Sequence, residues 1–238
     1  MRVRIFCASV LAGCSALVAA AAPTGLNVIP TTDLTPIKSW IGGIQNSNTS
    51  FSDTTFLTTP TPTFQSQFGV TSWLESGIDY AETPDVGDET LVFNAKALIL
   101  TEDELKPNAA IGIWNIAPGQ SPGYYITFSK TLNYDQEQYE RFRAHHRRNR
   151  KVLGRRVHVG MMMGDHGVLQ PFAGSDLQLT DNMVFQADWV SGAGNALTTG
   201  IAYVLPDQVT VLTPVLYFSN DERHFSGVSL SITHQFNL

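Results

Sequence analysis

The last residues of the chain, 225–238, read FSGVSLSITHQFNL and alternate between apolar and polar side chains. One parity carries Val228, Leu230, Ile232 and Phe236, and the other carries Ser229, Ser231, Thr233 and Gln235. Because successive side chains of a β-strand point to opposite faces, this segment is predicted to be a strand with one apolar and one polar face. Whether the apolar face meets a protein core or lipid decides which fold the chain adopts.

The same alternation recurs along the chain in about twelve segments of roughly 8–12 residues, the length expected of tilted membrane strands. Clear examples are residues 64–70, 74–80, 91–99, 157–163, 183–190 and 197–205. Short polar turns at 71–72, 180–182 and 206–208 alternate with longer links at 46–60, 83–89, 117–122 and 220–224. Short turns on one side and long loops on the other are typical of transmembrane barrels.

Composition favours lipid as the partner of the apolar faces. Charged residues make up 15% of the chain, against about 25% in soluble domains. No apolar run beyond the N-terminus is long enough for a spanning helix. Aromatic residues lie near predicted strand ends, as in interfacial girdles: Trp40, Trp73, Tyr124, Trp189 and Phe236. The sequence therefore predicts an all-β fold, a single antiparallel up-and-down transmembrane β-barrel of about 12 strands over residues 37–238. The alternative is a soluble exported β-sheet binding protein.

The N-terminus is predicted to be an export signal over residues 1–22, followed by an entry segment over residues 23–36. Arg2 and Arg4 precede an apolar stretch that ends in small residues. Leu11 to Cys14 forms an alternative lipobox, in which Cys14 would be acylated. Both cysteines, Cys7 and Cys14, lie inside this signal, so the mature chain is expected to carry no disulfide.

Along most of its mature length the chain resembles the Gram-negative outer-membrane β-barrel superfamily. The resemblance implies a location in the cell outer membrane, contact with its lipid and insertion by the barrel-assembly machinery. Phe236 resembles the C-terminal aromatic residue read by that machinery, although Asn237 and Leu238 follow it. The segment GLNVIPTTDLTP (25–36) is similar to the start of barrels associated with exopolysaccharide secretion. We expect a non-enzymatic narrow pore or a structural or secretion-associated component, with no cofactor.

Polar residues on the second parity are predicted to line the lumen: Glu75, Asp79, Asn94, Lys96, Asp176 and Asp188. Acids outnumber bases among them, so an open pore would mildly prefer cations. Alternatively, the same residues form a polar network that only stiffens the barrel. Barrels of about 8 strands are filled by side chains and those of 16–18 leave a channel, so twelve strands leave this choice open.

A basic insert is predicted at about residues 133–156, in a helical or loop conformation on the periplasmic side. Residues 140–156 hold 8 of the chain's 15 Lys and Arg residues. The candidates for binding an anionic or acidic partner, or for closing the lumen, are Arg143, Arg147, Arg148, Arg150 and Lys151. A solvated loop is the alternative. Export argues against nucleic acid as a partner, and the adjacent His145 and His146 lack metal-ligand spacing, so no metal site is expected.

One enzyme-like motif is present, HFSG at residues 224–227. His224 and Ser226 would project to the same side of a strand, and this His-x-Ser arrangement resembles outer-membrane phospholipase A. That resemblance implies an alternative function as a lipid hydrolase with Ser226 as nucleophile and His224 as base. The chain departs from that family at Gly227, where the family has asparagine.

Overall fold

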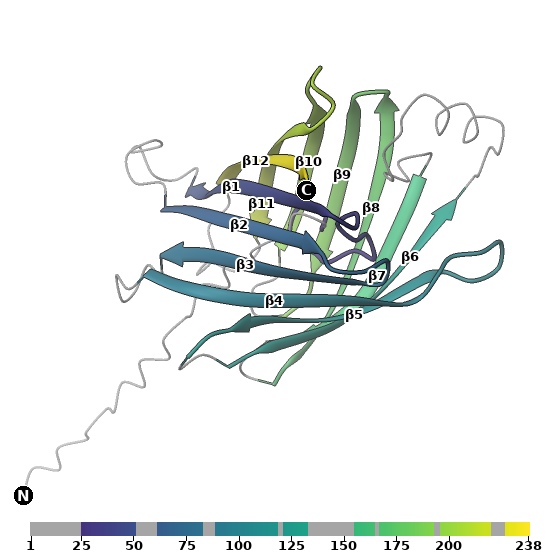
Figure 1. Cartoon of the computed structure of the whole chain (residues 1–238), viewed down its shortest axis with the longest axis horizontal. Coiled ribbons are helices and arrows are strands. Elements are labelled where there is room, and N and C mark those ends of the chain that lie inside the picture. Colours follow the sequence, from purple (N-terminus) through teal and green to yellow (C-terminus); the bar gives the residue numbers. More distant parts are fainter. Residues whose placement is uncertain are drawn as a thin grey trace, which may run out of the picture.

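The chain forms one closed antiparallel β-barrel of twelve strands (Figure 1). The computed structural model describes residues 25–50, 61–82, 89–118, 121–132, 155–164, 167–192, 196–219 and 227–238. The predicted fold is confirmed. The strands are β1 (Ser39–Ser50), β2 (Thr61–Gly69), β3 (Leu74–Glu82), β4 (Glu89–Leu100), β5 (Asn108–Ile116), β6 (Gly123–Leu132), β7 (Arg155–Met163), β8 (Leu169–Thr180), β9 (Met183–Val190), β10 (Ala196–Val204), β11 (Thr210–Ser219) and β12 (Gly227–Asn237). Within these ranges, no helix is long and apolar enough to cross a membrane.

The barrel closes where the first strand pairs with the last. In this register Ser39 lies opposite Asn237, Trp40 opposite Phe236 and Ile44 opposite Ile232. Each strand otherwise pairs with its neighbours in sequence, so none of the twelve presents an unpaired edge. We call the end of the barrel that holds Ser39 and Asn237 the Ser39 end.

The alternating pattern places apolar side chains outside and polar side chains inside. Large apolar side chains remain exposed on the outer face, among them Ile44, Phe64, Leu91, Phe93, Val159, Leu197, Leu216, Leu230 and Ile232. Inward positions of the same strands carry buried polar residues such as Gln65, Gln67, Thr127, Thr198 and Ser229. Large apolar side chains therefore face outward, while the inside of the barrel is mostly polar.

Aromatic side chains gather on the outer face at both ends of the barrel. At the Ser39 end, the ring of Trp40 stacks on Phe236 at 4.5 Å and on Phe68 at 6.0 Å between centroids. At the opposite end, Tyr124 and Trp189 remain exposed. Trp and Tyr prefer membrane–water interfaces, because their rings combine an apolar body with a polar group.

Residues 25–36, here called the N-terminal segment, lie inside the barrel (purple in Figure 1). Ile29 is fully buried and packs with Leu26 against Met162 of β7 and Phe172 of β8. Thr35, near the other end of the segment, is also buried. The sequence predicted an entry segment here but not its position in the lumen.

A tight turn connects the N-terminal segment to β1. The turn includes Lys38 with a positive φ of 57°, and the Ser39 N–H donates to the Pro36 carbonyl at 3.0 Å. Here the chain passes very close to Gly69, the last residue of β2. A Cβ atom added to Gly69 would lie 2.1 Å from the Pro36 oxygen. Only glycine leaves room for the segment to leave the lumen at this point.

Substituting Gly69 tests how closely the segment is packed. We expect Gly69→Ala to lower the midpoint of the heat-induced gel mobility shift in detergent, since overpacking costs about 1–3 kcal/mol. Gly164→Ala is the matched control, because no atom lies within 4 Å of its added Cβ. Equal midpoints for the two variants would show that the turn can move away from the added methyl group without loss of stability.

Candidate functional site

The lumen and the N-terminal segment form the candidate site. All six residues predicted to line the lumen lie on inward positions, in β3, β4, β8 and β9. Glu75, Asp79, Lys96 and Asp188 are buried, and Asn94 and Asp176 are partly buried. The structure divides these residues into groups, most of which contact the segment.

Glu75 and Lys96 form a buried ion pair that holds the segment near the Ser39 end. They lie opposite each other in β3 and β4, with 3.1 Å between Lys96 Nζ and Glu75 Oε1 and with both side chains 2% exposed. The Thr35 N–H donates to the other Glu75 oxygen at 2.7 Å. A buried charge pair is stable only when further hydrogen bonds satisfy it, and the segment supplies one.

Asp79 and Asn94 belong to a network within the barrel wall. Asn94 Nδ2 donates to Asp79 Oδ2 at 2.9 Å, and Gln67 Nε2 donates to Asn94 Oδ1 at 2.9 Å. The Ser66 N–H donates to Asp79 at 3.4 Å. These bonds connect β2, β3 and β4 to one another.

Asp188 of β9 binds the inner tip of the segment. The Val28 N–H donates to Asp188 Oδ2 at 3.1 Å, and the Thr198 hydroxyl of β10 donates to Oδ1. Thr198 Oγ1 in turn accepts from Asn27 Nδ2 at 3.0 Å. The tip is therefore bonded to β9 and β10, across the lumen from Glu75 on β3.

Arg156 of β7 binds the middle of the segment through Asp33. Arg156 Nη1 lies 2.7 Å from Asp33 Oδ2 and 3.9 Å from Asp176 Oδ2 of β8, and its side chain is 3% exposed. Burial acts to raise the pKa of Asp33, but the Arg156 charge and hydrogen bond outweigh it and hold this pKa below its usual range. Because 45% of the Asp33 side chain is exposed, the effect of burial is limited, and the neighbouring Arg156 charge determines the direction in which the pKa shifts.

The position of Arg156 changes the boundary of the predicted basic insert. The insert was expected to extend to residue 156, but β7 begins at Arg155. Arg155 is exposed and Arg156 points into the lumen, so both belong to the strand alternation. The partner candidates Arg143, Arg147, Arg148, Arg150 and Lys151 lie outside the described residues, as does the expected helix start.

Ser129, His158 and Asp176 form a hydrogen-bonded chain beside this ion pair. Ser129 Oγ lies 2.8 Å from His158 Nδ1, and His158 Nε2 lies 3.1 Å from Asp176 Oδ2. The Thr32 N–H of the segment donates to Ser129 Oγ at 3.3 Å. These hydrogen bonds connect β6, β7 and β8 to the segment.

The order Ser–His–Asp is that of a hydrolase triad, but here it is closed to substrate. Ser129 and His158 are fully buried, and Thr32 occupies the approach to the serine oxygen. The chain of bonds therefore extends the contacts that hold the segment. The other serine–histidine pair, His224 and Ser226, lies outside the described residues and remains an untested alternative.

Sequence reasoning missed the residues that join the segment to β6 and β7: Asp33, Ser129, Arg156 and His158. The inward parity of His158 was visible, because it alternates with Val157 and Val159. Arg156 shares that parity but was assigned to the basic cluster beside it. Within the described ranges, no cluster of three or more His, Cys, Asp or Glu residues is arranged to hold a metal ion.

Comparison with known proteins supports the fold alone. No protein family and no curated protein matches the chain. KdgM porin is similar in structure with a TM-score of 0.52 and 8% identity, over 83% of this chain and 99% of that porin. Mutants of Rhodopseudomonas blastica porin are similar with TM-scores of 0.39–0.40 and 10% identity, over 74% of this chain. The match spans 55% of those porins.

Proposed function

We propose that the protein is a non-enzymatic outer-membrane pore whose lumen is narrowed by its own N-terminal segment. The observation that carries this proposal is the segment itself, bonded across the inside of a closed barrel to Glu75, Arg156 and Asp188. The exposed apolar outer face and the aromatic side chains at both ends support insertion in a bilayer. The fold shared with KdgM porin is consistent with the proposal.

A structural or secretion-associated component is the second form of this proposal. The polar contacts of the N-terminal segment favour a lumen that is narrowed at rest, which suits either form. The two forms differ in the conductance expected after the N-terminal segment is removed from the lumen. A pore conducts, whereas a barrel with a structural role needs no continuous water path.

Bilayer recordings and extraction test the proposal together. We expect the protein to require detergent, to shift its gel mobility on heating, and to give small ionic conductance steps after refolding into planar bilayers. The steps should be small because the segment fills most of the lumen. Recovery as a detergent-free soluble monomer would contradict membrane insertion and would favour the exported binding protein considered in the sequence.

A further inference from the structure

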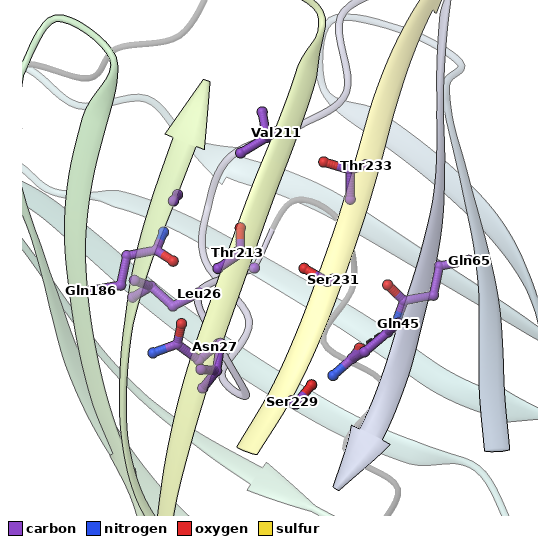
Figure 2. Close-up of a pocket in the computed structure, with 13 residues that line it drawn as sticks. Leu26, Asn27, Gln45, Gln65, Gln186, Val211, Thr213, Ser229, Ser231 and Thr233 are labelled. Carbon is purple, nitrogen blue, oxygen red and sulfur yellow. Dashed lines mark hydrogen bonds between the residues drawn. The ribbon is translucent and has the colours of Figure 1, made fainter. Parts of the chain in front are cut away.

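A cavity of about 70 Å³ remains beside the N-terminal segment. It lies between the segment tip, at Leu26 and Asn27, and the wall formed by β9 to β12, β1 and β2 (Figure 2). A volume of this size holds a few water molecules. It is therefore a described space beside the docked segment that can admit a small molecule.

Hydroxyl and amide groups supply the polar part of the lining. Its polar side chains include Gln45, Gln65, Gln186, Thr213, Ser231 and Thr233, which Figure 2 shows around the opening. No Asp, Glu, Lys, Arg or His is among the described residues that line the cavity. Hydroxyls and amides both donate and accept hydrogen bonds, and Val211 and Val215 add apolar contact area.

The charged lumen residues are absent from the described lining of the cavity and have partners of their own, although one of them, Asp188, lies on β9 beside it. Glu75 pairs with Lys96, Arg156 pairs with Asp33, and Asp188 accepts from Val28 and Thr198. An ion in the cavity would lose part of its hydration without meeting an opposite charge. An uncharged solute would exchange its water hydrogen bonds for hydroxyl and amide ones at little cost. The uncharged lining therefore favours neutral solutes, whereas the count of inward acidic residues in the sequence predicted a mild preference for cations.

Asn27 gives a second observation at the same place. It is 4% exposed, and its Nδ2 donates to Thr198. Asn27 is one of the residues that line the cavity, and its Oδ1 is buried without a hydrogen-bond partner in the described part of the chain. A buried acceptor of this kind favours a donor from solution, such as a solute hydroxyl or water.

We infer that the cavity is a selective constriction for small uncharged polyhydroxylated solutes of the size of glycerol. This inference rests on the proposed function as a pore. Each solute hydroxyl finds a Ser, Thr, Gln or Asn group, and the carbon chain contacts Leu26, Val211 and Val215. Charged solutes of similar size pass more slowly because the lining offers them no compensating charge.

Swelling of proteoliposomes tests the inference with three solutes of similar size. Glycerol is neutral, glycerate is an anion, and 2-amino-1,3-propanediol is a cation. We expect the native protein to pass glycerol at least several-fold faster than either charged solute. The double variant Thr213→Val, Thr233→Val should lose most of the glycerol flux, because valine keeps the shape of threonine without its hydroxyl. Thr199→Val, on the outward parity of β10, is the matched control and should keep it.

The outcomes separate this inference from the proposed function. Equal flux of the three solutes through the native protein, or full glycerol flux in the double valine variant, overturns the constriction while leaving a pore. Failure of the proposed function appears differently, as absence of any conductance even when the N-terminal segment is replaced by a flexible linker.

Discussion

Replacing residues 25–35 with a Gly/Ser linker of equal length is expected to raise the single-channel conductance several-fold. In the native chain the segment runs through the lumen from Glu75 to Asp188. The linker lacks the side chains of Leu26, Ile29 and Asp33 that hold it there. It should therefore leave the lumen, and the freed polar wall should fill with water. Planar-bilayer recording of the refolded protein measures the change.

A second replacement controls for linker insertion as such. Residues 103–106, in the exposed β4–β5 connection at the Ser39 end, receive the same Gly/Ser treatment. We expect this variant to keep native conductance, since their side chains do not enter the lumen contacts described above. If the segment variant folded, as judged by heat-modifiable mobility, but conducted no better than native protein, the segment would not be what narrows the lumen. A structural or secretion-associated role would then gain support.

The barrel could be predicted because the sequence pattern that produces its strands is periodic. Each strand repeats an apolar–polar alternation. The outward direction of Ile232 and the inward direction of Ser231 can therefore be predicted without knowing which residues they contact. The same parity places Glu75, Lys96 and Asp188 inside. An apolar environment outside and water or polar partners inside suit the two faces.

The occupied lumen could not be predicted because the segment has no such period. Several of its contacts are made by backbone N–H groups, at Val28, Thr32 and Thr35, which every sequence possesses. The close approach at Gly69 depends on three-dimensional geometry. The sequence instead predicted a candidate closing element in the basic residues 140–156. Within the described chain, the base that meets the segment is Arg156, at the boundary of that cluster.

Arg156→Gln is expected to release the N-terminal segment, and this is the second large effect. Removing one member of a buried ion pair costs roughly 3–5 kcal/mol. The cost here should be smaller, about 1–3 kcal/mol, because Asp33 is partly exposed and water screens such pairs. The chain can avoid the cost by moving Asp33 into water, which undocks the segment and leaves the barrel intact. Conductance should therefore rise while the mobility-shift midpoint changes little.

A cysteine at position 32 reports undocking independently of current. Thr32 is 3% exposed and its Oγ1 has no partner in the described residues, so Thr32→Cys should be tolerated. Maleimide labelling should be slow in this background and faster when Arg156→Gln is added. The parent chain without the new cysteine corrects for Cys7 and Cys14. Lys106→Gln, which breaks the exposed pair with Asp103, should leave the labelling rate unchanged.

Acid should reproduce the effect of Arg156→Gln. The pKa of Asp33 is held below its usual range in the docked state, whereas a released Asp33 titrates near the ordinary value of about 3.9. Docking is therefore fully stabilised above about pH 5 and weakens as pH falls below about 4. Asp33→Asn removes this titration, so its conductance should be higher at neutral pH and should change less with acid. Equal acid responses in the native and Asp33→Asn backgrounds would assign the pH dependence to other carboxylates in the lumen and would exclude the Asp33–Arg156 pair as the contact that controls docking.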